Sequence, residues 1–221
     1  LETTAEELAA TLEEMGAKRY RLGQIRRRLY RGRAGSFDEM TDLPVRLRDE
    51  LALRFALFTS QVDRHEIAGD GTEKLLLRLA DGEHTECVLL RDENDRRTVC
   101  LSSQVGCAMG CVFCASGMGG LVRDLSRGEI LEQMFHLARL LPPEERLSHI
   151  VVMGMGEPLM NLDAVLSALD EATSEEGFHI SARRVTISTL GRLEGIHRLA
   201  LHPAPYHLAV SLHAADDALR Y

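Results

Sequence analysis

Three cysteines lie in one short stretch of the sequence, CAMGCVFC, which contains Cys107, Cys111 and Cys114. Cysteine thiolates are the preferred ligands of iron-sulfur clusters. A loop with the spacing C-x-x-x-C-x-x-C can bind three irons of a [4Fe-4S] cube and leave the fourth iron without a protein ligand. An open iron can chelate a small molecule, so the spacing predicts a cluster that also binds a cofactor.

A tetrahedral zinc site is the alternative for these thiols. Zinc takes four ligands, and a Cys3His site would need a histidine beside the three cysteines. None of the nine histidines lies within the loop, and no second C-x-x-C pair occurs. The spacing fits zinc poorly, but the residues alone leave zinc or inert thiols open.

The other two cysteines, Cys87 and Cys100, precede the loop. Five cysteines are an odd count, crowded into one part of a chain whose first residues lack the features of a signal peptide. This distribution indicates metal or redox chemistry rather than a disulfide scaffold. Considered alone, each of the two residues is a small buried hydrophobe.

The elements that must position the loop alternate along the second half of the chain. Strands are expected at residues 99–106, 150–158, 184–191 and 207–214, with helices at 126–140, 162–171 and 193–201. Strand-then-helix repeats predict an α/β fold whose parallel sheet is curved into a barrel or partial barrel. Chemistry in such folds lies at the carboxyl ends of the strands, where the cysteine loop also falls.

Three regions are expected. Residues 1–57 show a helical apolar pattern and predict a small N-terminal helical domain. Residues 58–96 predict a β-hairpin and connecting region, with a turn at Asp81-Gly82, and residues 97–221 form the α/β core.

Charge and hydropathy limit the partners and the location that the sequence allows. The formal charge is -8, yet eight basic residues fall together with no acid among them: Lys18, Arg19, Arg21, Arg26, Arg27, Arg28, Arg31 and Arg33. From composition alone a solvated helix face is the favoured interpretation, and a nucleic-acid contact is the other. No apolar run approaches the length of a membrane span, so we expect no membrane partner and a cytoplasmic location.

Five stretches together resemble one family. They are FDEMTDLP, CLSSQVGCAMGCVFCASG, MGMGEPLMN, RRVTISTLG and AVSLHA, in that order. The chain resembles the RlmN/Cfr family of radical S-adenosylmethionine (SAM) enzymes, which methylate an adenosine of 23S ribosomal RNA, and it is more similar to the RlmN side. The resemblance implies a partial radical SAM (β/α) barrel, a [4Fe-4S] cluster on Cys107, Cys111 and Cys114, and SAM as the second cofactor.

The resemblance also implies which residues contact SAM. These are Gly156 and Glu157, Ser188, and Ser211, Leu212 and His213. From the residues alone, the MGEP stretch could equally be a structural turn, and Ser188 and His213 would be core or turn residues.

Two catalytic residues follow from the same resemblance. Cys100 matches a thiol that resolves a covalent protein-RNA intermediate by forming a disulfide bond. Glu86 matches the family's proton acceptor, although the segment between Glu86 and Cys100 is one residue longer than usual. A solvent-facing strand glutamate is the alternative for Glu86.

The implied reaction is methylation of carbon 2 of an adenosine in 23S rRNA, with transfer RNA as a second substrate, through a methyl-cysteine intermediate. The partners implied are these RNAs and an electron donor such as flavodoxin, with a monomer as the complete state. The N-terminal domain, residues 1–57, would contact the RNA, with the basic stretch from Arg26 to Arg33 as a phosphate contact. The family carries a further cysteine near its C-terminus, and none follows Cys114, so we expect a fragment that lacks this segment. The alternatives are methylation at carbon 8, as on the Cfr side, and a non-catalytic iron-sulfur RNA-binding homologue.

Overall fold

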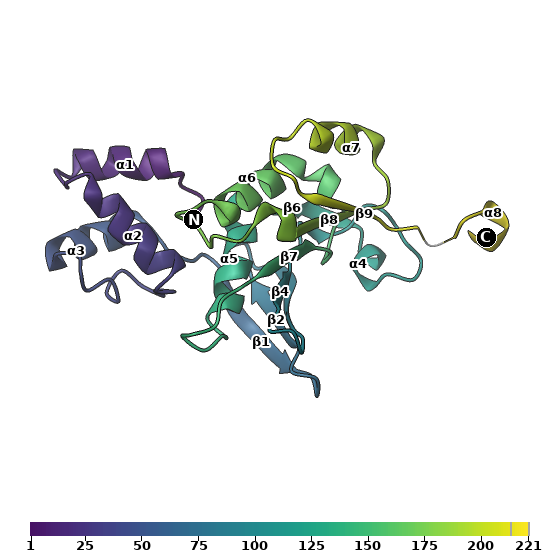
Figure 1. Cartoon of the computed structure of the whole chain (residues 1–221), viewed down its shortest axis with the longest axis horizontal. Coiled ribbons are helices and arrows are strands. Elements are labelled where there is room, and N and C mark those ends of the chain that lie inside the picture. The colour runs from purple at the N-terminus through teal and green to yellow at the C-terminus, as the bar shows by residue number, and fades with distance from the viewer. Residues whose placement is uncertain (213, 221) are drawn as a thin grey trace.

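A seven-stranded mixed sheet forms the centre of the molecule in the computed structural model, which describes residues 1–212 and 214–220 (Figure 1). Its strands are β1 (Gln61–Ile67), β2 (Glu73–Arg78), β3 (His84–Arg91), β4 (Arg97–Cys100), β7 (His149–Val152), β8 (Val185–Thr189) and β9 (His207–Val210), in the order β1-β2-β3-β4-β7-β8-β9. The first four strands pair antiparallel, and β4, β7, β8 and β9 pair parallel. The predicted α/β class and the parallel sheet are confirmed.

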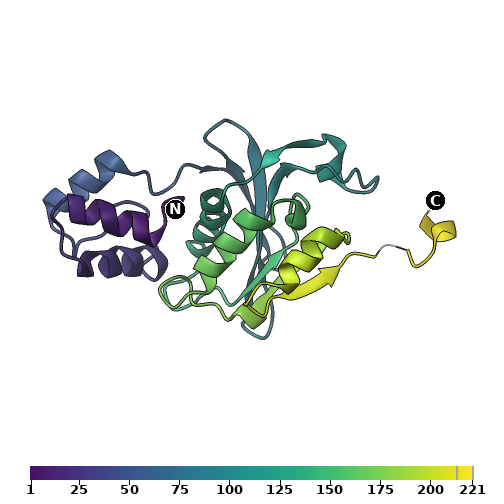
Figure 2. The same ribbon diagram turned by 90° about the horizontal axis from the view of Figure 1, so that it is seen from above.

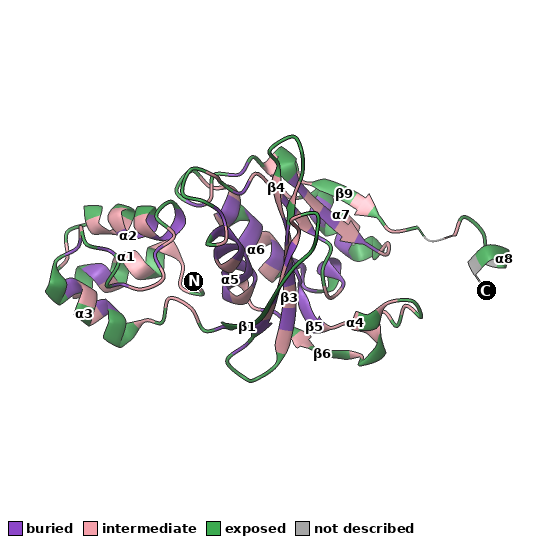
Figure 3. Cartoon of the chain, turned by 90° about the horizontal axis from the view of Figure 1, so that it is seen from below, coloured by how far each residue is buried: buried purple, intermediate pink, exposed green. Residues whose placement is uncertain are grey.

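The helices that alternate with the parallel strands lie close to their expected places. They are α5 (Arg127–Ala138), α6 (Leu162–Thr173) and α7 (Leu193–Ala200), with the short elements α4 (Ala115–Met118), η1 (Pro158–Met160), η2 (Ala182–Arg184) and α8 (Asp217–Arg220). Ser126 and Glu129 form a capping box that fixes the start of α5. Helices α5 and α6 run side by side on one face of the sheet (Figure 2), whereas α4 lies on its other side (Figure 3).

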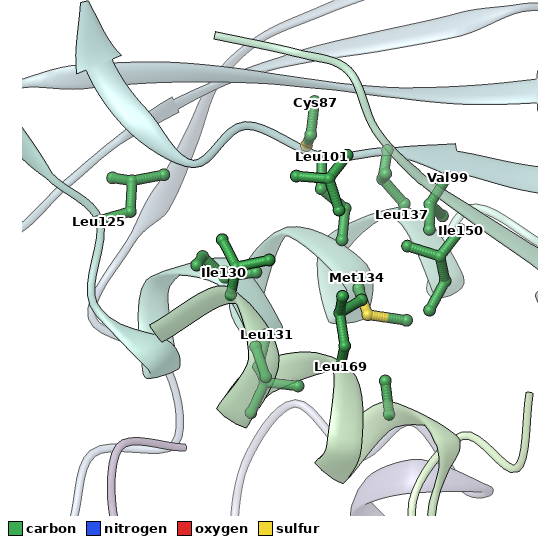
Figure 4. Packing of buried hydrophobic residues seen from close by; sticks show 14 of the residues in the cluster. Cys87, Val99, Leu101, Leu125, Ile130, Leu131, Met134, Leu137, Ile150 and Leu169 are labelled. Atoms are coloured by element: carbon green, nitrogen blue, oxygen red, sulfur yellow. The ribbon is translucent and has the colours of Figure 1, made fainter. Parts of the chain in front are cut away.

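The main core fills the space between the sheet and these helices. Alternate strand residues such as Val99 and Ile150 point toward α5 and α6, where Met134 and Leu169 meet them (Figure 4). All four are fully buried. The helix-covered face of the sheet is therefore apolar, and only the opposite face is free to carry chemistry.

The predicted extent of the strand at residues 99–106 is wrong. The chain leaves the large sheet after Cys100 and forms β5 (Gln104–Gly106), which pairs with β6 (Leu121–Asp124) in a separate two-stranded sheet. The Ser102 backbone turns to the side chain of Gln133 on α5, to which its N–H donates (2.8 Å) and from which its carbonyl accepts (3.0 Å). The buried amide replaces a neighbouring strand, and the break places residues 107–120 in a loop held between β5 and β6.

The N-terminal helices pack on the outer side of α5. They are α1 (Ala5–Glu14), α2 (Tyr20–Tyr30) and α3 (Val45–Arg54), and they enclose a second apolar cluster. Phe135 of α5 enters this cluster, with its ring centroid 5.0 Å from that of Tyr30 and 4.8 Å from that of Phe178. The helical unit lies far from α4, at the other side of the molecule (Figure 1).

The basic stretch does not form one free face. Arg26 is buried and pairs with Glu171 of α6 at 2.7 Å, Arg28 pairs with Asp42 at 2.8 Å, and Arg33 donates to the carbonyl of Leu141 at 2.7 Å. These arginines therefore fix the helical unit internally and against the core. The exposed members of the stretch are Lys18, Arg19, Arg27 and Arg31.

Within the described residues, none of the helices has the length and apolar character needed to cross a membrane.

Candidate active site

A cavity of about 740 Å³, including open solvent at its mouth, lies where β7 and β8 end and the cysteine loop folds over them. Its lining comprises Cys107, Met109, Cys111, Phe113, Cys114, Ser116, Val152, Met153, Gly154, Gly156, Glu157, Pro158, Ser188, Thr189, Leu190 and Ser211. The structure thus brings together all three loop cysteines and four of the predicted cofactor residues. They meet at the carboxyl ends of the parallel strands, as expected for this fold class.

Tight turns hold the cysteine loop in place. The Cys107 N–H donates to the Gly120 carbonyl at 2.9 Å, and the Cys114 N–H donates to the Cys111 carbonyl at 3.0 Å. Gly106 has a φ of +73°, and a Cβ there would lie 2.0 Å from the Gly120 oxygen. Only glycine fits this position.

The donor set of the cavity is three thiols, the ligand type of an iron-sulfur cluster. The three thiols are free and partly exposed, and in the described part of the chain no three His, Cys, Asp or Glu side chains come close enough to share one metal ion. The thiolates of a zinc site converge on a single ion, whereas those of a cube bind different irons and stay farther apart. Among the residues that the structure describes, no histidine lines the cavity.

Glu157 is buried at the floor of the cavity and already has several hydrogen-bond donors. Its Oε1 accepts from Thr189 Oγ1 (2.7 Å) and from the Leu159 N–H (3.2 Å), and its Oε2 accepts from the Leu190 N–H (2.9 Å). A carboxylate offers about four acceptor positions, so one remains for a further donor. Glu157 therefore joins the end of β8 to η1, so the MGEP stretch has the structural role that the sequence left open, and its link to β8 is an addition to it.

Gln104 connects the two loops that frame the cavity, and sequence reasoning missed it. This fully buried side chain accepts from the Glu157 N–H through Oε1 (2.9 Å) and donates through Nε2 to Asp124 Oδ1 on β6 (2.7 Å). Gly156, with a φ of +100°, packs against it, and a Cβ there would lie 2.6 Å from the Gln104 Cβ. The polar run Ser102-Ser103-Gln104 at the end of an apolar strand was the available signal.

Ser188 and Ser211 lie side by side at the ends of β8 and β9, with their hydroxyl oxygens 3.0 Å apart. Leu212 is 68% exposed and is not part of the cavity lining. His213 lies outside the described residues.

Cys100 and Glu86 lie on the same open face of the sheet but do not line the cavity. Cys100 pairs in register with Val88, two residues along β3 from Glu86. Burial raises the pKa of the Cys100 thiol. The Glu86 side chain is 43% exposed, and its Oε1 accepts from Lys74 Nζ at 3.1 Å.

Cys87 belongs to the apolar core, as expected, and burial strongly raises the pKa of its thiol. All five cysteines are free. The expectation of a disulfide bond is therefore not supported for this chain.

Known proteins match the chain along most of its length. The profile of the "Radical SAM superfamily" matches residues 101–221, and that of the "Ribosomal RNA large subunit methyltransferase N-terminal domain" matches residues 1–57. A protein of Rhodopirellula baltica named "Probable dual-specificity RNA methyltransferase RlmN" is 59% identical over all of this chain and 59% of its own length. A protein of Symbiobacterium thermophilum with the same name is 45% identical over 97% of this chain and 58% of its own length.

The fold is also that of a solved structure, described as a radical SAM methyltransferase from Sphaerobacter thermophilus, with a TM-score of 0.93 and 46% identity. The match covers 99% of this chain and 64% of that one, so the chain spans about three fifths of the length of the proteins it matches. Two family profiles, the shared fold and the cavity with its three cysteines agree. The chain belongs to the radical SAM superfamily and, within it, to the RlmN/Cfr family.

Proposed function

We propose that the complete protein methylates carbon 2 of an adenosine in 23S rRNA, with transfer RNA as a second substrate. The observation that carries this proposal is the cavity in which Cys107, Cys111 and Cys114 face Gly156 and Ser188. The printed names of the relatives, which are dual-specificity RNA methyltransferases, support an RNA substrate.

The cavity residues have distinct proposed roles. The three loop cysteines hold the [4Fe-4S] cluster, and SAM binds beside it at Gly156, Glu157, Ser188 and the segment 211–213. When bound, these groups would supply a 5'-deoxyadenosyl radical, which can remove hydrogen from a carbon that polar chemistry leaves unreactive. Gly156 lines the cavity with backbone atoms alone, and the remaining acceptor position of Glu157 suits an ammonium group.

Glu86 and Cys100 act on the RNA side of the reaction. Their open face of the sheet adjoins the cavity, and an adenine must be splayed out of its helix to reach it. Glu86 takes the proton that leaves carbon 2. The Cys100 thiol loses its proton and attacks the sulfur of the methyl-carrying cysteine, so that an S–S bond forms as the C–S bond to the product breaks.

The sequence has no cysteine after Cys114, so none of its five cysteines is proposed as the methyl carrier. The electron donor is a small redox protein such as flavodoxin, and the complete enzyme acts as a cytoplasmic monomer.

Anaerobic turnover of the complete protein with a 23S rRNA fragment tests the proposal. We expect 2-methyladenosine on mass-spectrometric nucleoside analysis, together with labile sulfide and about four irons per chain. The Cys111→Ala variant should lose both product and cluster. A product of 8-methyladenosine would contradict the carbon 2 assignment, and a chain with stoichiometric zinc and no sulfide would contradict the cluster.

A further inference from the structure

A second pocket, lined by basic side chains, lies at the other end of the parallel strands from the cavity. It has a volume of about 500 Å³, including open solvent at its mouth. It lies between the end of α2 and the loops that precede β7 and β8, and its lining comprises Tyr30, Arg31, Arg33, Ala138, Pro143, Arg146, Leu147, Gly177, Phe178 and His179. We call this the basic pocket. None of its lining residues is acidic.

Three of its basic side chains have no partner in the protein. Arg31, Arg146 and His179 are exposed, and none of their side chains forms a hydrogen bond or an ion pair with the described residues. Arg33 is held in place, because its guanidinium donates to the carbonyls of Leu141 (2.7 Å) and Pro142 (3.1 Å).

The cations of the pocket act on one another. Burial, and next the positive charge of Arg146, lower the pKa of Arg33. The negative charges of Glu145 and Glu144 act in the opposite direction on this pKa, and the carboxylate of Glu145 is also paired with Arg97. Cations gathered in this way favour the binding of an anion.

The backbone at the basic pocket is also unusual. In the described part of the chain, three residues other than glycine have a positive φ, and two of them line this pocket: Arg33 at +55° and His179 at +57°. L-residues rarely adopt this conformation, and it concentrates at ligand sites, where the surrounding structure holds it. The charge and the backbone therefore point independently to a binding site.

We propose that the basic pocket binds phosphodiester groups of the RNA substrate, through Arg31, Arg146 and His179. The planar fork of an arginine matches the oxygens of a phosphate. Because the chain carries a formal charge of -8, much of the surface repels RNA backbone, and a pocket whose lining is basic and holds no acid is the place that attracts it. Arg31 also lines a neighbouring pocket together with Glu175 and Glu176. The proposal rests on the proposed function only in taking the ligand to be RNA. Its site is new, since it lies at the opposite end of the strands from the cavity.

Salt-dependent RNA binding by the 221-residue chain tests this site. The probe is an unmodified transfer RNA transcript, and affinity is measured over a series of chloride concentrations. Affinity falls as salt rises, so the slope of log affinity against log salt is negative. We expect Arg146→Ala to reduce the magnitude of this slope by about 1, and the double variant Arg31→Ala/Arg146→Ala to reduce it by about 2. At low salt the double variant should bind roughly tenfold more weakly. Arg54→Ala, which removes an equally exposed and unpaired arginine on α3, should match the unsubstituted chain.

Three outcomes would overturn the proposal. The first is a double variant with the unsubstituted slope and an unchanged thermal unfolding curve, and the second is an unsubstituted chain that does not bind the transcript. The third outcome concerns inorganic phosphate, titrated at constant ionic strength. If Arg146→Ala abolishes phosphate binding but does not change the salt dependence of RNA affinity, the pocket is a site for free phosphate. Cluster content and SAM cleavage do not depend on the pocket, so their failure would contradict only the proposed function.

Discussion

The five cysteines of the chain differ in their surroundings more than in their spacing. Cys107, Cys111 and Cys114 are partly exposed at a cavity, Cys87 is in the apolar core, and Cys100 is half-buried on the open face of the sheet. A thiol must become a thiolate to bind iron or attack sulfur. Burial raises the pKa of Cys87 and of Cys100, so both thiols are harder to deprotonate than a thiol in water. The loop thiols are therefore the ones best placed to bind a cluster.

Replacing Cys100 separates its proposed role from that of the cluster ligands. In the complete protein, Cys100→Ala should keep the [4Fe-4S] cluster and still cleave SAM, because neither step needs this sulfur. Release of the product should fail, leaving a protein-RNA adduct that survives denaturation and is seen as a shifted gel band. If Cys100 only packs, turnover is normal and stability falls by about 1 kcal/mol, as for a small core truncation.

Gln104 should act by positioning the loops around the cavity. Gln104→Ala leaves the Glu157 N–H and the Asp124 carboxylate without their partner, at a site with no exposure to solvent. We expect a loss of unfolding free energy of about 1–3 kcal/mol, and an altered electron paramagnetic resonance signal of the reduced cluster when SAM is added. Asn161→Ala, which removes a buried amide bonded to the carbonyls of Ser103 and Leu125, is the matched control for stability. An unchanged SAM-dependent signal in Gln104→Ala would leave Gln104 as a purely structural residue.

At the scale of elements, regular patterns could be predicted and the break between them could not. The apolar pattern predicted β8, α5, α6 and α7 to within two residues. The strands expected to reach residues 158 and 214 were predicted too long, because β7 ends at Val152 and β9 ends at Val210. The strand expected through residue 106 instead ends at Cys100, because Gln133 on α5, far along the chain, binds the Ser102 backbone. A local apolar pattern contains no information about such a partner. The spacing of the cysteines, in contrast, is local, and this is why the cluster loop could be recognised.

The β5–β6 pair depends on one glycine. Gly106→Ala places a Cβ against the Gly120 oxygen at a backbone conformation that alanine disfavours. We expect the hairpin to open, with a loss of unfolding free energy of about 1–3 kcal/mol, and reconstitution of less than one cluster per chain by iron and sulfide assay. Gly82→Ala, a positive-φ turn glycine with open space around it, should cost stability without lowering cluster content. Full cluster content in Gly106→Ala would show that the loop does not need this turn.

At the scale of the molecule, the helical unit was predicted, but its attachment was not. Its apolar positions indicated a helical domain. The contact of Tyr30 with Phe135 and the pairing of Arg26 with Glu171, in contrast, join residues more than a hundred positions apart. Chain patterns do not show such contacts. The consequence for function is that part of the basic stretch is used to hold the unit on the core. The cations left exposed are Lys18, Arg19, Arg27 and Arg31, and Arg31 lies at the basic pocket.

Thr59 and Ser60 lead from the helical unit into the sheet, and polar side chains of α5 hold them. Protonation of one of these side chains, His136, should make the stability of the fold sensitive to pH. The Ser60 hydroxyl lies 3.0 Å from His136 Nε2, and the Glu132 carboxylate accepts from the N–H groups of Thr59 (2.8 Å) and Ser60 (2.7 Å). Burial lowers the pKa of His136 from its usual 6.5. The unfolded chain therefore binds a proton more readily than the folded chain.

The stability that depends on neutral His136 is fully present above a pH of about 6.5 and is lost as the pH falls through the lower pKa of the folded chain. We expect the unfolding free energy, from urea titrations, to decrease between about pH 7 and pH 5, and the decrease to be smaller in His136→Gln, which cannot take up the proton. His149, whose pKa burial also lowers, should retain part of the dependence in that variant. Replacing the exposed His197 by Gln should leave the dependence unchanged. An equal decrease in His136→Gln and in the unsubstituted chain would show that His136 is not the group that responds to pH.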